Sequence, residues 1–156
     1  MKINLLVDSD KVMGGYLNID PCAKDGEAKV KGIIHDLNEY VDDGEAEIIR
    51  AIDAIGYFAH VDSAVVADNW IRKLKHGGTI IIGGIDIIEV ARAIANRTID
   101  IDQANILLYG NQKHSWDFYK AGFTALQLVE YLESKGLKIT KKRIHDFHFI
   151  VEAVRP

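Results

Sequence analysis

The sequence predicts an α/β fold in which a mostly parallel sheet ends in an antiparallel hairpin. Three observations support this fold class. Short runs rich in isoleucine and valine alternate with segments whose apolar residues recur at helical spacing. Several strand-like runs end in an aspartate, at the edge where the strands of an open α/β sheet bind ligands. The chain then closes with two consecutive strand-like runs, Leu137 to Arg143 and Asp146 to Val154, which predict the hairpin.

The composition is typical of one globular domain, which we expect to span residues 1–156. The chain is 48% hydrophobic and 27% charged, and a chain of this length buries roughly 70% of its unfolded surface. No segment approaches the ~20 apolar residues of a membrane span, so no membrane partner is expected. The single cysteine, Cys22, excludes an internal disulfide and fits a cytoplasmic location. A net charge of -4 argues against a nucleic-acid partner, because such binding depends on lysine and arginine contacts with phosphates.

The first twenty residues predict two strands, each with an acid at its end. Lys2 to Val7 is followed by Asp8, and Tyr16 to Ile19 is followed by Asp20. Ligands of open α/β sheets bind outside the carboxyl ends of the strands, so we expect both acids at the rim of a crevice. There a carboxylate can accept hydrogen bonds from two ribose hydroxyls. Residues 8–15 are barely enough for a parallel crossover, so the first helix must be shortened to about one turn, or the strands pair differently.

This opening resembles one family, the short stand-alone class I S-adenosylmethionine (SAM)-dependent methyltransferases. Their chains begin Met-Lys-Leu-Asn-Leu-Gly-Cys-Gly and continue, after a short loop, with Gly-Tyr-Val-Asn-Ile-Asp. The resemblance implies a Rossmann-like methyltransferase sheet with helices on both faces, and a SAM site that includes Asp8 and Asp20. Leu6-Val7-Asp8 replaces Gly-Cys-Gly, whose small residues let the backbone approach the cofactor. The matching residues are Lys2, Asn4, Leu5, Gly15, Tyr16, Asn18, Ile19 and Asp20.

A third strand is predicted from Lys31 to His35, and Asp36 and Leu37 follow it. In the family, an Asp-Leu pair at this position lies against the adenine. The resemblance therefore implies that Asp36 accepts a hydrogen bond from the exocyclic amine and that Leu37 covers a ring face. An exposed acid after a strand is an equally good interpretation of Asp36 alone.

Glu45 to Ile52 predicts the central strand, and Asp53 lies at its end. The segment that follows resembles the family's His-x-Leu-Glu-His type segment at the mouth of the crevice. The positions of the two family histidines fall on Asp53 and Tyr57. Asp53 is therefore a candidate for taking a proton from the methyl acceptor.

A second block of resemblance begins at Asn69 and reads Asn-Trp-Ile-Arg-Lys-Leu-Lys-His-Gly-Gly-Thr-Ile-Ile-Ile. It is similar to the family's Glu-Trp-x-Arg-Val-Leu-Lys-Pro-Gly-Gly. We expect a helix capped by Asp62 that runs to Lys75, ends at His76-Gly77-Gly78 and leads into a strand from Thr79 to Ile82.

Three further helices are expected in the second half of the chain. Asp86 is predicted to cap a helix through Asn96, an interpretation that we favour over a catalytic acid. Ile99 to Tyr109 is typical of another short helix. Thr124, with glutamine three residues later, predicts a capping box at the start of the last one.

The segment Gly110 to Phe123 is a long polar loop rich in aromatic residues, and it carries His114, Asp117 and Tyr119. Such loops more often serve a function than a simple connection. It resembles the family's loop over the acceptor side of the crevice. His114 is thus a candidate general base, and an exposed histidine without a role is an equally good interpretation.

No metal site is predicted. The sequence lacks the ligand spacings of zinc sites, and it also lacks a phosphate-binding glycine loop and a nucleophile elbow. His145 and His148 are an odd number of residues apart, so on strands they face opposite sides and cannot share an ion.

The leading functional hypothesis is a SAM-dependent methyltransferase acting on a small-molecule or glycan acceptor. Asp8, Asp20, Asp36 and Leu37 would contact the cofactor, and His114 or Asp53 would take the proton. The alternative is a methyltransferase-like domain that has lost SAM binding and serves as a binding or assembly module, because Leu6-Val7-Asp8 replaces the glycine motif. A third hypothesis places another nucleoside or a nucleotide-sugar in the crevice. DNA base methylation is not expected without an Asn-Pro-Pro-Tyr type signature, and a homo-oligomer is compatible with the sequence.

Overall fold

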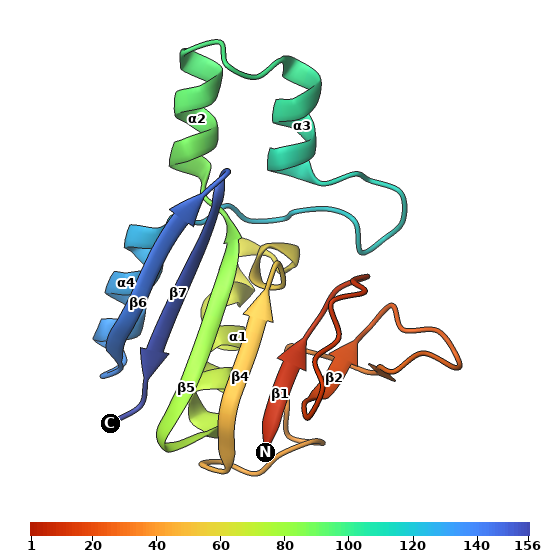
Figure 1. The fold of residues 1–156 in the computed structure, drawn as a ribbon, viewed down its shortest axis with the longest axis vertical. Helices are drawn as coiled ribbons and strands as arrows, with labels where there is room; N and C mark the ends of the chain where they lie inside the picture. Colours follow the sequence, from red (N-terminus) through yellow and green to blue (C-terminus); the bar gives the residue numbers. More distant parts are fainter.

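The computed structural model describes residues 1–156, which form one seven-stranded sheet (Figure 1). The strand order is β3-β2-β1-β4-β5-β7-β6, in which β7 is antiparallel to both of its neighbours and the remaining pairs are parallel. The predicted mostly parallel sheet with a C-terminal antiparallel hairpin is therefore confirmed. The strands are β1 (Lys2–Leu5), β2 (Leu17–Asp20), β3 (Val30–Lys31), β4 (Ala46–Ile52), β5 (Leu74–Ile85), β6 (Lys138–His145) and β7 (His148–Val154).

The two longest helices lie on the same face of the sheet. Figure 1 shows α1 and α4 behind the strands, with α2 and α3 beyond the end of β5. The Tyr131 hydroxyl of α4 donates a hydrogen bond of 3.0 Å to the carbonyl of Ala64 in α1, which joins these helices directly. None of the helices is long and apolar enough to cross a membrane. The helices are the 3₁₀ turn η1 (Ile55–Tyr57), α1 (His60–Lys73), α2 (Ile87–Ala95), α3 (Ile101–Tyr109) and α4 (Ala125–Ser134).

The opposite face differs from the expectation of helices on both faces. The connection from β1 to β2 contains no helix, and neither does the connection from β2 to β3. Strands β1 and β2 still pair in parallel, with Asn4 opposite Asn18. The short β1–β2 connection is held by side chains instead, because the Asn4 amide donates to the Asn18 side chain at 2.8 Å and to the Lys11 carbonyl at 3.0 Å.

The hydrophobic core fills the space between the sheet and the pair α1 and α4. Alternate residues of the strands point into it, as the two-residue period of a strand requires. Trp70 of α1 is fully buried, and its indole N–H donates to the carbonyl of Ile34 at 2.7 Å. The inward residues of the four central strands, none more than 1% exposed, are Ile3, Leu5, Ile49, Ala51, Ile80, Ile82, Phe149, Val151 and Ala153.

The third strand is shorter than predicted. The sequence favoured a strand from Lys31 to His35, whereas β3 ends at Lys31. Beyond it the chain turns into the core, where Ile34 and Leu37 are fully buried. The apolar side chains that suggested a strand therefore serve to attach this segment to α1.

The start and the end of α1 also differ from the prediction. Asp62 lies in the first turn and is not the N-cap, and an acid there still interacts favourably with the helix dipole. The helix ends at Lys73, and β5 begins directly at Leu74. The predicted helix end at Gly77 is instead part of β5, where its φ of 74° accompanies a shift in strand register.

The predicted caps of the later helices are found. Asp86 precedes α2 and accepts hydrogen bonds from the backbone N–H groups of Ile88 and Glu89. Thr124 caps α4 by accepting from the N–H of Gln127, which is one half of the predicted capping box. Asp100, which the sequence did not single out, forms a full capping box at α3.

Candidate functional site

Asp20, at the end of β2, accepts as many hydrogen bonds as its carboxylate can hold. The backbone N–H groups of Asp8, Ser9 and Cys22 donate to it at 3.0, 3.3 and 2.8 Å, and the Lys29 ammonium donates at 2.9 Å. The Asp20 side chain is 0% exposed. Burial alone would raise the pKa of this carboxyl, but the four donors outweigh burial and hold the pKa below its usual range.

Lys29 covers Asp20 from the loop between β2 and β3. Its side chain is only 8% exposed, and its ammonium also contacts Glu27 at 3.2 Å and the Ser9 carbonyl at 3.0 Å. Burial lowers the pKa of the amine, but the two carboxylates outweigh this effect and raise it above the usual value. Both partners are thus charged near neutral pH, and Lys29 takes one of the acceptor positions of the Asp20 carboxylate.

Asp8 and His114 are brought together from two distant loops. The Nε2 atom of His114 lies 2.8 Å from Oδ2 of Asp8, and both side chains are partly exposed. This contact joins the loop after β1 to the loop between α3 and α4. A residue predicted for the cofactor and one predicted for the proton are therefore hydrogen-bonded to each other.

Asp36 and Leu37 lie apart from these groups. Leu37 is fully buried in the core. Asp36 accepts from the backbone N–H of Asn38 at 2.9 Å and from the Asn69 amide at 3.1 Å. The hydrogen bond from Asn38 is the main cause of the lowered pKa of Asp36. In this geometry Asp36 and Leu37 anchor a turn against α1.

Asp53 lies at the end of β4 beside a small cavity. Its φ of 54° is in the left-handed region, which aspartate and asparagine tolerate better than most residues. Its Oδ1 atom is buried and has no hydrogen-bond partner. The adjoining cavity is about 20 Å³ in volume, enough for a single water-sized group.

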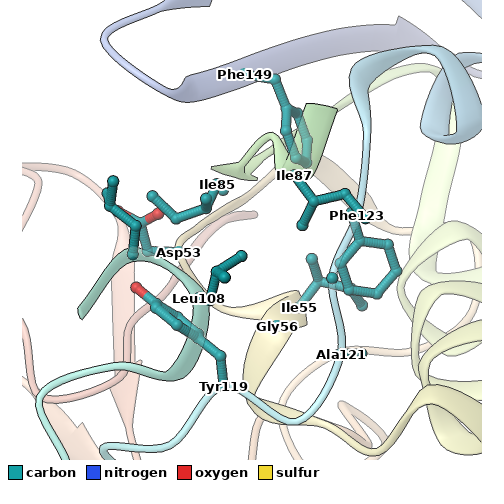
Figure 2. Close-up of a pocket in the computed structure, with 13 residues that line it drawn as sticks. Asp53, Ile55, Gly56, Ile85, Ile87, Leu108, Tyr119, Ala121, Phe123 and Phe149 are labelled. Atoms are coloured by element: carbon teal, nitrogen blue, oxygen red, sulfur yellow. The ribbon is translucent and has the colours of Figure 1, made fainter. Parts of the chain in front are cut away.

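Figure 2 shows the Tyr119 hydroxyl directed toward Asp53 at one side of the pocket. The rings of Tyr57 and Tyr119 are 4.9 Å apart. Burial raises the pKa of Tyr119, and the negative charge of Asp53 raises it further. Burial is also the main cause of the raised pKa of Tyr57. Both phenols therefore remain protonated and can act as hydrogen-bond donors.

One backbone angle in the segment after β1 suits the glycine motif of the resemblance, although the side chains differ. Asp8 has a φ of 48°, the conformation for which glycine is favoured. Val7 belongs to the hydrophobic core, and Leu6 is 2% exposed. The Asp20 carboxylate does not fit a ribose as it stands, because four protein donors occupy its acceptor positions. No group of three or more His, Cys, Asp or Glu side chains is placed to hold a metal ion.

Two residues of the site were not predicted from the sequence. Lys29 lies in a polar loop, and nothing in the spacing links it to Asp20. Tyr119 was noticed only as part of the aromatic loop, and its backbone N–H donates to the Tyr109 carbonyl at 3.2 Å, which fixes the loop against the end of α3.

Known structures resemble this one in fold. The PH0226 protein from Pyrococcus horikoshii matches with a TM-score of 0.59 and 14% identity over 91% of this chain and 73% of that chain. A SAM-dependent methyltransferase from Methanosarcina mazei matches with a TM-score of 0.57 and 13% identity over 80% and 65%. The 1,6-didemethyltoxoflavin-N1-methyltransferase of Burkholderia thailandensis, solved with bound S-adenosylhomocysteine, matches with a TM-score of 0.54 and 12% identity over 81% and 50%.

The fold is that of the class I SAM-dependent methyltransferases. Identities of this size establish the fold alone. The chain covers 35%, 50% and 60% of the length of three of the matched structures. No protein-family model and no curated protein sequence matches the chain.

Proposed function

We propose that this chain is a SAM-dependent methyltransferase acting on a small-molecule or glycan acceptor. The observation that carries the proposal is the fold, which matches that of a SAM-dependent methyltransferase with a TM-score of 0.57, together with an acid at the end of β2. In open α/β sheets this edge is the place for a ligand. A methyltransferase fold also needs few catalytic side chains, since positioning supplies much of the rate.

Asp20 is the residue proposed to hold the ribose, with Asp8 beside it at the rim. SAM, when bound, would supply an activated methyl group. Because a carboxylate has about four acceptor positions, and all are used, Lys29 must leave Asp20 first. Losing a charge-assisted hydrogen bond costs about 1.5–3 kcal/mol, which lowers ligand affinity by roughly 10- to 100-fold.

Asp53 is the residue proposed to accept the proton of the acceptor. Its free Oδ1 atom can receive a hydrogen bond from an O–H or N–H group. His114 is the other candidate, but its Nε2 atom is already paired with Asp8. The arrangement therefore favours Asp53, with the Tyr119 hydroxyl available to orient the acceptor.

Isothermal titration with SAM tests the first step, on the unmodified chain and on Lys29→Met. We expect Lys29→Met to bind SAM at least 10-fold more tightly, because it frees an acceptor position on Asp20. Lys24→Met, an exposed lysine in the same loop, is the matched control and should leave the affinity unchanged. No heat from either the unmodified chain or Lys29→Met, at millimolar protein and ligand, would contradict the proposal.

A second candidate function, which the same carboxylate leaves open, is a methyltransferase-like binding or assembly module. A fully hydrogen-bonded Asp20 stabilises two loops without any ligand, as expected of a methyltransferase-like binding or assembly module. Under this alternative Lys29→Met also fails to bind SAM. Thermal-shift measurements with nucleosides and nucleotide-sugars would then separate an empty scaffold from a site for another nucleoside.

A further inference from the structure

One face of the sheet has no helical layer. Figure 1 shows α1 and α4 behind the sheet and no helix in front of β4, β5 or β7. Parallel sheets are normally covered on both faces. The inward residues of these strands are at most 1% exposed, whereas their outward neighbours are partly exposed. We call this set of outward residues the open face: Ile48, Arg50, Ile52, Thr79, Ile81, Ile150, Glu152 and Val154.

The strand register arranges the open face in three rows that run across β4, β5 and β7. The first row is Ile48, Thr79 and Val154, and the second is Arg50, Ile81 and Glu152. The third is Ile52, Gly83 and Ile150. A Cβ atom on Gly83 would lie 2.8 Å from Ile52 and 3.3 Å from Ile150, so these two side chains close over the glycine.

Each row is complementary to the same row of a second copy that runs in the opposite direction, from β7 to β4. A twofold axis parallel to β5, in front of it, would place β4 of one copy over β7 of another. Ile48 then meets Val154, Ile52 meets Ile150, and Ile81 meets its own copy on the axis. Arg50 meets Glu152 twice, once on each side. From this pattern we propose that the open face binds a second copy of the chain, forming a twofold homodimer of face-to-face sheets.

The charges on the face are available for this pairing. Arg50 donates to the Asn4 side chain at 3.0 Å, and Glu152 lies 3.0 Å from Lys141. Both contacts lie at the sides of the face, so each charged group keeps further hydrogen-bonding positions. The same axis brings Lys2 near Lys138 at the rim, where both are exposed and water screens the repulsion.

The size of the face predicts a weak dimer. Three strands about 4.8 Å apart and three rows about 7 Å apart give a footprint of roughly 300 Å² per copy. The two copies together would bury roughly 600 Å², below the 1,200–2,000 Å² of most stable interfaces. We therefore expect a weak, concentration-dependent association.

Sedimentation velocity from 5 to 500 µM tests the proposal on the chain alone, without any cofactor. The unmodified chain should shift from monomer to dimer across this range. Arg50→Glu should weaken association at least 10-fold, and so should Glu152→Arg. The double variant Arg50→Glu/Glu152→Arg should restore association, because the pairs reform with exchanged signs. Val65→Asp, on the exposed side of α1, is the matched control and should still dimerise.

Circular dichroism melts of each variant separate loss of the dimer from loss of the fold. The proposal would be overturned if the unmodified chain stayed monomeric at 500 µM. So would a dimer that folded Arg50→Glu leaves intact, because the second copy would then use another surface. Failure of the double variant, while both single variants remain folded, would reject the twofold arrangement. None of these readouts depends on SAM binding.

Discussion

The Lys29 ammonium lies 2.9 Å from the Asp20 carboxylate and seals the end of β2 from solvent. The pair connects a polar loop to the centre of the proposed cofactor site. It therefore affects both the stability of the chain and access to the site, and the two effects can be measured separately.

Asp20→Asn should destabilise the fold by about 2 kcal/mol at pH 7, because the neutral amide loses the ion pair and turns an N–H group toward other donors. The pKa of Asp20 is lowered in the folded state, so its stabilisation is complete above the unfolded value near 3.9 and is lost as pH falls through the folded pKa. The pKa of Lys29 is raised in the folded state. The stabilisation from its charge is therefore complete below the unfolded-state pKa near 10.4 and is lost as the pH rises through the folded-state pKa.

Urea unfolding at pH 3, 5, 7 and 9 measures this dependence. The difference between the unmodified chain and Asp20→Asn should be constant from about pH 5 to 9 and should shrink near pH 3. Asp10→Asn, an exposed acid in the same region, is the control and should change stability little. A difference as large at pH 3 as at pH 7 would show that the charge of Asp20 is not the cause.

Asp86→Ala should be more destabilising than the loss of an ordinary helix cap. The Asp86 carboxylate is 2% exposed, and it accepts from two N–H groups of α2 and, at 2.9 Å, from Ala125 at the start of α4. Its removal leaves N–H groups of two helices without partners, so we expect a loss of about 3 kcal/mol. The control Asp100→Ala removes the exposed cap of α3 and should cost about 1 kcal/mol. Equal losses would mean that the Ala125 contact contributes nothing.

These caps illustrate what the sequence could predict. Asp86 and Thr124 were readable because a cap acts on residues two or three positions away along the chain. The carboxyl-end positions of Asp20 and Asp53 were readable too, since they follow from strand boundaries. The short β1–β2 connection predicted a helix of about one turn or a different pairing, whereas the structure keeps the parallel pairing and has no helix there.

The contacts that define the site could not be predicted, because they join distant segments. His114 and Asp8 are 106 residues apart, and Asn69 and Leu37 are 32 apart. The end of β3 was missed for a related reason. Ile34 is a residue type common in strands. Its carbonyl accepts a hydrogen bond from the buried Trp70 indole, and this contact, which the sequence does not reveal, holds the chain away from the sheet.

His114→Gln should loosen the loop between α3 and α4 without unfolding the chain. The contact with Asp8 is partly exposed, and such pairs contribute at most about 1 kcal/mol to stability. Hydrogen exchange should therefore increase in residues 111–118 and near Asp8, while the unfolding midpoint moves little. Lys113→Gln, the neighbouring exposed residue, is the control. Unchanged exchange in His114→Gln would show that the loop is held by its other contacts.

Asp53→Asn tests the unpaired carboxylate without relying on methyl transfer. Asparagine tolerates the same left-handed backbone, so the stability of the fold should change by at most about 1 kcal/mol. Burial and the charge of Asp53 both raise the pKa of Tyr119, so neutralising Asp53 should lower this pKa toward the ordinary tyrosine value without reaching it.

Titration of tyrosinate absorbance measures the shift, and Tyr119→Phe identifies which transition belongs to this phenol. Asp102→Asn, an exposed acid on α3, is the control for a general change in charge. If Asp53→Asn leaves the Tyr119 titration unchanged, the two groups do not share one environment. The proposed acceptor site would then lose its second polar group, because Tyr119 could no longer orient a substrate whose proton Asp53 receives.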